Sequence, residues 1–285
     1  MIRIFLIISA MLTIIAFFGD SLGDAVNQWR FQTYGILVFI FVYTTISRFF
    51  GYAGVSLLLL LINFFVISSS VNIISLERNA EGSRVLRVSY QKSPVALIDS
   101  FEDVQANNVD IVAINNPKST NITVSDFLPT PYKVLNENDI QKSFIASRGK
   151  TYSTGRVRIS SETDAAFTTI EAADSPLTIL SIDFSTVPVQ QLSEAFDVLE
   201  GFVSSRNEPV IIIGDFNTVV WSGVFGEFLD NSGLHAVNPL LSSAKNILFP
   251  PTFYVLGYKN LQFINLLSLP ARDNKYSPYV LDIKI

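Results

Sequence analysis

Three long apolar runs within the first 76 residues constrain the fold of this chain more than any other feature. They cover residues 2–18, 34–46 and 55–67 and are almost free of charged side chains. With its flanks, each run reaches about 17–20 residues, which is the length of an α-helix that crosses the hydrocarbon core of a bilayer. We therefore predict that residues 1–76 form a bundle of three transmembrane helices, at about 2–18, 32–49 and 54–75.

Two other interpretations of these runs stay open at this stage. The first run could be a signal peptide, but its apolar stretch is long and no small-x-small cleavage site follows it in residues 19–25. The other two runs could be buried core helices, although residues 57–62 would then have to be enclosed on every side. A retained, lipid-embedded helix is the favoured interpretation for all three runs.

The few charges around these runs predict an orientation. Arg3 precedes the first run and Arg48 lies between the second and third, so the positive-inside rule puts both on the cytoplasmic side. Three spans then place everything after Leu76 outside the cytoplasm. We predict a bacterial inner-membrane protein with its carboxy-terminal domain in the periplasm. The absence of cysteine excludes disulfides and thiolate zinc sites.

The remaining residues, 83–285, have the composition of one globular domain, long enough for a packed core. Apolar periodicity predicts helices over 96–106 and from Pro188 onward, and strands over 85–89, 111–114, 156–160, 165–172, 177–184 and 279–285. The segments 156–160 and 165–172 are expected to pair across a turn. Alternation of strands and helices, with some strands adjacent, predicts a layered α/β sandwich.

A buried strand at 209–213 leads directly into Gly-Asp-Phe-Asn at 214–217. Asp215 and Asn217 suit a tight turn, because their side chains satisfy nearby backbone groups. The chain has a single histidine, His235, which follows Gly233 and is expected at a helix end or in a loop.

The run from this strand to Leu234 resembles the endonuclease/exonuclease/phosphatase family, the metal-dependent phosphodiesterases of the DNase type. The resemblance extends, in the expected order, over nearly all of residues 83–285. It implies a layered α/β sandwich of the endonuclease/exonuclease/phosphatase type. The three apolar runs ahead of the domain are similar to those of the membrane-anchored bacterial branch of that family. Enzymes of the family use two histidines, which this chain cannot supply.

Compared with the family pattern, Asp215 and Asn217 are the retained site residues, and the other positions are substituted. The substituted positions are Ser89, Asn116, Asp183, Asn265, Lys275 and Tyr276. Asn116 stands for a glutamate and Lys275 for an aspartate, so the charge that would attract magnesium is lost. Tyr276 stands for the general base, and a phenol with a pKa near 10 is a poor base at neutral pH. The resemblance therefore implies a catalytically degenerate member with no catalytic residue and no metal cofactor, leaving Asp183 and Asp215 as one weak cation-binding pair.

Charge argues against nucleic acid as a partner, since 16 basic residues face 21 acidic ones from residue 83 onward. The one basic grouping comprises Arg148, Lys150, Arg156 and Arg158, for which a solvated face is expected. The predicted partners are a lipid bilayer and a protein in a membrane complex. Exposed aromatic anchors are expected at 249–251, Phe253, Tyr254 and Tyr258, unless these residues cover the domain's own sheet.

Three functions follow as hypotheses. The first is a noncatalytic, membrane-tethered accessory or scaffolding subunit of a membrane complex. The second is a divergent metal-dependent phosphodiesterase or phosphatase acting on lipids or nucleotides. The third is a ligand-binding module that keeps the pocket without the chemistry.

Overall fold

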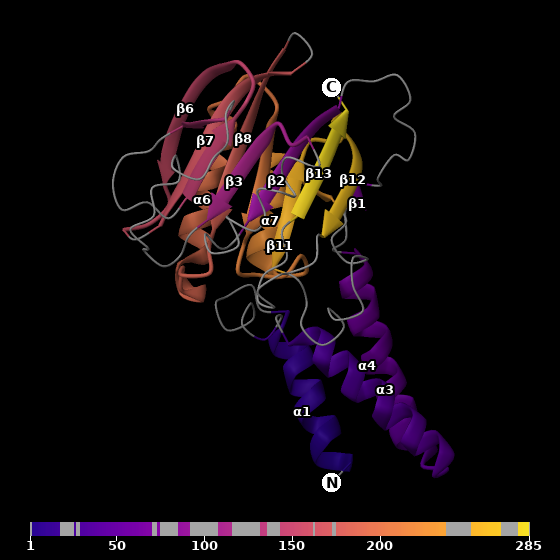
Figure 1. The fold of residues 1–285 in the computed structure, drawn as a ribbon. Helices are drawn as coiled ribbons and strands as arrows, with labels where there is room; N and C mark the ends of the chain where they lie inside the picture. The colour runs from indigo at the N-terminus through magenta and orange to yellow at the C-terminus, as the bar shows by residue number, and fades with distance from the viewer. Residues whose placement is uncertain are drawn as a thin grey trace.

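The fold consists of an amino-terminal bundle of helices and a β-sandwich, with the amino terminus at the end of the bundle away from the sandwich (Figure 1). The structure is a computed structural model. It describes residues 2–17, 26, 29–69, 73–74, 85–91, 108–115, 132–135, 143–161, 163–172, 175–237, 252–268 and 279–284.

Each of the three apolar runs forms a helix: α1 (Ile2–Ile15), α3 (Arg30–Ile46) and α4 (Phe50–Ser69). The helices pack on one another through a small apolar cluster contributed by all three, namely Leu6, Leu37, Ile40, Leu59 and Leu60. The third helix begins and ends earlier than the predicted range 54–75. Within the residues that the structure describes, no helix is both long enough and apolar enough to cross a membrane.

The bundle carries polar side chains inside and large apolar side chains outside. Buried polar residues occur on all three helices, and Asn63 on α4 donates from Nδ2 to Thr13 Oγ1 of α1 at 2.9 Å. Among the described residues, every large apolar side chain that is exposed belongs to residues 4–65, with the exception of Tyr152. This distribution is the reverse of that in a water-soluble core, where large apolar side chains are the ones enclosed.

Two sheets stack face to face and form the sandwich. The seven-stranded sheet runs in the order β1 (Ile73–Ile74), β10 (His235–Val237), β11 (Phe253–Gly257), β9 (Val210–Asp215), β8 (Ser175–Asp183), β7 (Asp164–Ala172), β6 (Thr151–Arg158). The six-stranded sheet runs β12 (Gln262–Ser268), β13 (Tyr279–Lys284), β2 (Val85–Gln91), β3 (Ile111–Asn115), β5 (Ser143–Ser147), β4 (Lys133–Leu135). The predicted α/β sandwich is confirmed.

Two helices cover the outer face of the seven-stranded sheet. The helix α6 (Leu192–Ser204) connects the parallel strands β8 and β9, and α7 (Gly223–Ser232) follows β9. Phe196 of α6 stacks against Phe228 of α7, with ring centroids 5.0 Å apart. Because helices cover one face and the second sheet covers the other, β9 is buried along its whole length, which explains its unbroken apolar sequence.

The predicted elements compare well with the observed ones. The predicted pair 156–160 and 165–172 is the antiparallel pair β6 and β7, although β6 starts earlier, at Thr151. The chain after Pro188 first makes a short 3-10 turn (Val189–Gln191) and then α6. The helix predicted at 96–106 lies outside the described residues. The start of the sandwich differs too: β1 pairs with β10, so the sheet begins ahead of the predicted domain start at residue 83.

Candidate functional site

The carboxyl ends of four strands meet at one edge of the sandwich. The parallel strands β8 and β9 bring Asp183 and Asp215 opposite each other in register. The parallel strands β2 and β3 end at the same edge, where the hydroxyl of Tyr90 lies 3.5 Å from the carbonyl oxygen of Ile182. In Figure 1, β13 points away from the helical bundle, so its antiparallel neighbour β2 and the edge with the two aspartates face the bundle.

The turn after β9 uses both retained side chains to hold backbone groups. The Oδ1 atom of Asp215 accepts the backbone N–H of Asn217 at 2.9 Å, and Asn217 Nδ2 donates to the carbonyl of Val187 at 3.1 Å. Asn217 has a left-handed backbone with φ of 50°, a conformation that asparagine tolerates better than most residues. The turn-forming role predicted for Asp215 and Asn217 is confirmed.

Gly214 allows the end of β9 to approach β8 closely. Its φ is 154°, and a Cβ atom at this position would stand 2.0 Å from the carbonyl oxygen of Ile182. No larger residue fits without displacing the backbone of β8. Glycine at 214 therefore fixes the spacing of the two strands that carry Asp183 and Asp215.

Asp183 is used in the same way as Asp215. Its Oδ1 atom accepts the backbone N–H of Ser185 at 2.9 Å. Both carboxylates are almost enclosed, with 7% of Asp183 and 9% of Asp215 exposed. Each therefore has one oxygen engaged by a local turn and little contact with bulk solvent.

Tyr90 fills the space between the two sheets next to these carboxylates. Only 2% of the residue is exposed. Burial, followed by the negative charges of Asp183 and Asp215, raises the pKa of the Tyr90 phenol well above its ordinary value. The phenol is therefore neutral at any physiological pH, and it can donate a hydrogen bond but cannot act as a base.

Asn115, the last residue of β3, ties the two sheets together beside Tyr90. Its Nδ2 atom donates to the Tyr90 hydroxyl at 3.1 Å and to the carbonyl of Ile182 in the other sheet. Its Oδ1 atom accepts from Ser181 Oγ at 3.2 Å and from Ser143 Oγ. An asparagine amide offers two donors and one acceptor oxygen, so this side chain is saturated within the protein.

Two more aromatic rings line the same edge. Phe253 lies 4.8 Å from the ring of Tyr90 and stacks on Tyr279 at 4.0 Å with an angle of 8° between the planes. Burial raises the pKa of Tyr279, and the charge of Asp215 raises it further. The rings of Tyr90, Phe253 and Tyr279, called the aromatic plug below, thus occupy the space around Asp215.

This chain is similar to known proteins in its fold. The sequence matches no protein-family model and no curated protein. Solved structures do match, and the three described here each cover 70% of this chain. An endonuclease/exonuclease/phosphatase family protein from Bacteroides thetaiotaomicron superposes with a TM-score of 0.56, 11% identity and 98% of its own chain covered. The chain has the endonuclease/exonuclease/phosphatase fold.

Two further matches are named for an activity or a bound ligand of their own. A mannosyl-6-phosphatase from Bacteroides thetaiotaomicron superposes with a TM-score of 0.51 and 12% identity, with 70% of this chain and 100% of that chain covered. The human Nocturnin catalytic domain with bound sulfate superposes with a TM-score of 0.51 and 16% identity, with 70% of this chain and 94% of that chain covered. At such identities the likeness concerns the fold.

The described residues at this edge do not suit the magnesium ion that endonuclease/exonuclease/phosphatase enzymes use. Magnesium requires several oxygen ligands in an octahedron. Here one oxygen of each aspartate is bound by a turn N–H, and the Asn115 oxygen is taken by two serines. Within the described ranges, no group of three or more His, Cys, Asp and Glu side chains could hold a metal ion.

The other substituted family positions are distributed differently from the aspartates. Ser89 is buried but alternates with Tyr90 along β2, so the two side chains point to opposite faces of the sheet. Asn265 on β12 lies opposite Asp282 on β13, and Asp282 lies opposite Arg87 on β2. Arg87 precedes Tyr90 by three residues, so it lies about 10 Å from Tyr90 along the strand. Asn116, Lys275 and Tyr276 lie outside the described residues. Sequence reasoning missed Asn115, and of the neighbours Ser89 and Tyr90 at the end of the first strand it selected only Ser89 as a site residue. The pattern that could have found both residues is the alternation of side chains along a strand. It places Tyr90 on the same face of β2 as Val88, and Asn115 on the same face of β3 as Ala113.

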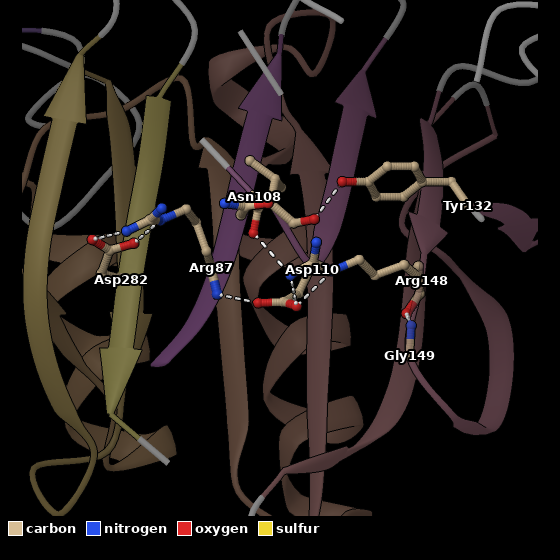
Figure 2. Close-up of polar contacts among 9 residues, drawn as sticks. Arg87, Asn108, Asp110, Tyr132, Arg148, Gly149 and Asp282 are labelled. Carbon is tan, nitrogen blue, oxygen red and sulfur yellow. Dashed lines mark hydrogen bonds and ion pairs between the residues drawn. The ribbon is translucent and has the colours of Figure 1, made fainter. Parts of the chain in front are cut away.

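A network of charged residues holds the opposite end of β3, as Figure 2 shows. Asp110 accepts from Arg148 Nε at 2.8 Å and from the backbone N–H of Arg87 at 2.9 Å. Arg87 also pairs with Asp282 through two hydrogen bonds, at 2.6 Å and 3.2 Å, and the hydrogen bond with Asp282 raises the pKa of Arg87. The network links β3, β2 and β13, and it thereby positions the strand that ends in Asn115.

The basic residues grouped in the sequence form ion pairs and hydrogen bonds with neighbours in the same domain. Lys150 pairs with Glu171 at 3.2 Å, and Arg156 pairs with Asp164 at 3.9 Å. Arg158 donates to the carbonyl of Ser160. Lys150 is solvated, as predicted, whereas the side chain of Arg156 is only 23% exposed, so the solvated face covers part of the grouping.

The structure decides between the two interpretations of the aromatic candidates and corrects the placement of His235. Phe253 and Tyr254 are buried in strand β11, so they cover the domain's own sheet and cannot serve as exposed anchors, while Tyr258 is partly buried. Residues 249–251 lie outside the described part of the chain. His235 does not cap a helix: α7 ends with Gly233 in a left-handed conformation, and His235 begins β10 opposite Gly257.

Proposed function

We propose that this chain is a noncatalytic, membrane-tethered protein whose endonuclease/exonuclease/phosphatase-like domain serves as an accessory or scaffolding subunit of a membrane complex. The observation that carries the proposal is the aromatic plug next to Asp183 and Asp215. Where this fold would need an open, polar pocket, three packed rings and the saturated amide of Asn115 stand instead.

The chemistry of the same residues supports the noncatalytic role. Phosphodiester hydrolysis needs an activated water and groups that stabilise the charged phosphoryl group. Tyr90 has a raised pKa and cannot take a proton, and both aspartates are engaged by turns. Loss of one general acid or base alone costs about 10²- to 10⁴-fold in rate. A chain that lacks several such groups retains the fold without the reaction.

The reversed polarity of the helical bundle supports attachment to a membrane. Polar side chains such as Asn63 and Thr13 bond to each other inside, while side chains such as Phe39 and Phe65 face outward. In lipid, the inner polar groups keep their hydrogen bonds and the outer apolar side chains contact acyl chains without a free-energy penalty. In water, the same arrangement would expose a large apolar surface. We place the protein in a bacterial inner membrane with the sandwich in the periplasm, because of the positions of Arg3 and Arg48.

The same distribution suggests where a protein partner binds. Tyr152 is the single large apolar side chain exposed on the described part of the sandwich, whereas the described helices expose many. Buried aromatic and apolar anchors supply most of the energy of an interface. We therefore propose that the partner is itself a membrane protein and contacts the bundle.

Hydrolysis assays on the full chain in mild detergent test the proposal. With magnesium or manganese, the protein should not hydrolyse model phosphodiesters, phosphoinositides or nucleic acids above a blank without enzyme. Asp215→Ala removes one of the two buried carboxylates, and Asp197→Ala, on the exposed face of α6, is the matched control. Turnover that disappears in Asp215→Ala and persists in Asp197→Ala would refute a noncatalytic role.

Purification of the native complex tests the accessory role separately. Asp215→Ala combined with Asn217→Ala should leave the partner bound, as long as the domain folds. A double variant that retains its partner while the complex loses its activity would show that the site itself is functional.

A further inference from the structure

The six-stranded sheet ends in an edge strand, β12, that is open to further pairing. It pairs with β13 on one side, and no strand in the described part of the chain pairs with its other side. The seven residues of β12 include no charged residue and no proline, and four of them are Phe, Ile or Leu. The outer N–H and C=O groups of such an edge are a template for one more strand.

The other three edges of the two sheets carry features that discourage further pairing. The strand β1 has two residues, and β4 has three, the first of which is Lys133. The strand β6 has eight residues and carries Arg156 and Arg158. Short edge strands and charged side chains are devices by which proteins block such an edge. Among the described edges, only β12 is both long and uncharged.

A bulge interrupts β12 near its start and leaves a regular stretch beyond it. The register shifts between Phe263 and Asn265, so Ile264 has no partner on β13. After the shift, residues 265–268 pair one for one with β13. Phe263 is fully buried between the sheets, and Leu266 packs against the same apolar cluster. An added strand would therefore meet a regular backbone and the apolar rim of the core.

The β12 edge lies on the side of the sandwich that is joined to the helical bundle. The strands β3 and β5 of one sheet contact β8 of the other, and β5 also contacts β7, so the strand orders of the two sheets run in the same direction. This places β12 on the same side as β1, which follows α4 along the chain (Figure 1). A membrane protein that contacts α4 is therefore on the correct side of the domain to reach β12.

We infer that the β12 edge receives an extended, uncharged segment of the partner, which adds to the six-stranded sheet as one further strand. This inference rests on the proposed accessory role in a membrane complex. In such pairing, main-chain hydrogen bonds supply affinity and alternate side chains supply specificity. A charge next to Phe263 and Leu266 would lose its hydration without gaining a counter-charge on β12, so the side of the segment that faces the core has to be apolar.

The geometry argues against a second copy of this chain as the occupant. In Figure 1, β13 points away from the bundle, so β12 runs toward it. Antiparallel pairing of β12 with itself would put the two bundles at opposite ends of the pair, where they could not share one bilayer. Parallel self-pairing across a two-fold axis would turn the inner faces of the two copies to opposite sides of the joined sheet, so their apolar rims would not meet.

Hydrogen exchange measures strand addition directly. The full chain is compared in its native complex, purified in mild detergent, and after separation from the partner. Amides in residues 262–268 should exchange about 10-fold more slowly or better in the complex, because the new ladder protects them. Amides in residues 151–158 of β6 should exchange equally in both samples. Equal exchange of β12 in the two samples overturns the inference.

A pair of lysine variants tests the chemistry of the edge. Ile264→Lys places a charge on β12 without replacing a residue that pairs with β13, and Thr154→Lys, exposed on β6, is the matched control. Ile264→Lys should lower retention of the partner about 10-fold or more, since pairing would desolvate the ammonium group, and Thr154→Lys should not change it. Circular dichroism checks that both variants fold. Equal retention by two folded variants contradicts the inference.

Photo-crosslinking in native membranes identifies the occupant. Benzoylphenylalanine at residue 264 should attach to an uncharged segment of the partner, and the same group at residue 154 should not attach to it. Attachment to a charged segment, or to a second copy of this chain, contradicts the inference.

The fate of the partner separates this inference from the proposed function. A partner that stays bound without protecting β12 contradicts strand addition alone. A chain that has no partner in its native membrane contradicts the accessory role, and strand addition with it.

Discussion

Replacing Tyr90 with alanine should destabilise the sandwich by about 4 kcal/mol. The ring is buried between the two sheets and packs against Phe253 at a centroid distance of 4.8 Å. Truncation of a buried aromatic ring to alanine costs about 3–5 kcal/mol, because it removes apolar burial and leaves a cavity. The lost hydrogen bond from Asn115 contributes about 1 kcal/mol of this cost.

A second substitution distinguishes the contribution of the Tyr90 ring to stability from that of its hydroxyl. Tyr90→Phe keeps the packing and should cost only about 1 kcal/mol, since Asn115 still donates to the carbonyl of Ile182. Tyr152→Ala is the matched control on the surface, where the side chain is 50% exposed and contacts Glu171. That control should cost no more than about 1 kcal/mol.

Urea titration of the full chain in mild detergent measures these differences. The chain has two tryptophans, and Trp221 is buried in the sandwich whereas Trp29 is exposed at the bundle. In a Trp29→Phe background, the emission of Trp221 therefore reports unfolding of the sandwich alone. If Tyr90→Ala were as mild as Tyr152→Ala, the ring would not fill the interior, and an open pocket beside the aspartates would have to be reconsidered.

Three further predictions follow from other parts of the molecule. Gly214→Ala should prevent the sandwich from folding, because its Cβ would stand 2.0 Å from the carbonyl oxygen of Ile182. The control Gly226→Ala, on α7, meets no atom within 4 Å and should stabilise the domain by up to about 1 kcal/mol in the same titration. Burial lowers the pKa of His235, so protonation favours the unfolded state, and stability should fall as pH drops below about 6.5. Wild type should accordingly lose more stability than His235→Gln between pH 7.5 and 5.5, and equal losses would contradict this assignment. A phosphatase reporter fused after residue 285 should be active and a cytoplasmic fluorescent reporter at the same position dark; the opposite pattern would reverse the proposed orientation.

The sequence predicted the regular elements well where local pattern decides them. The strand 209–213 and the turn at 214–217 were evident, because an apolar run followed by Gly-Asp-Phe-Asn leaves few conformations open. The pairing of β6 with β7 was equally clear from the short turn between them. The three apolar runs indicated three helices, and helices are what they form.

The candidate site was harder to predict because it depends on which face of a strand each residue occupies. On β2, Ser89 was chosen by similarity to a family pattern, while the described residues that meet between the sheets are Tyr90 and Asn115. A shift of one residue changes the face, because the side-chain period of a strand is two. The contact of Asn115 with Ile182 joins residues 67 positions apart, and no local pattern reveals such a pair.

The burial of Phe253 and Tyr254 could not be read from composition for a similar reason. Both follow residues 249–251 closely and were grouped with them as candidate anchors, with burial against the domain's own sheet as the alternative. Strand β11 instead pairs on both sides, with β9 and with β10, and this central position encloses its side chains. Burial here is a consequence of the order of the strands, which is decided by the whole domain.

The short strand β1 determines how far the domain can move from the bundle. It begins at Ile73, and α4 ends at Ser69, so the chain between them can span at most about 14 Å even when fully extended. Because β1 hydrogen-bonds to β10, this short linker is fixed to the sheet itself. In the proposed membrane location, a domain held this way samples a small volume, so its bundle-facing edge has a high effective concentration near any neighbour of the bundle. If the proposed partner on the bundle also contacts this edge, a longer linker would weaken that second contact without altering a single residue in it.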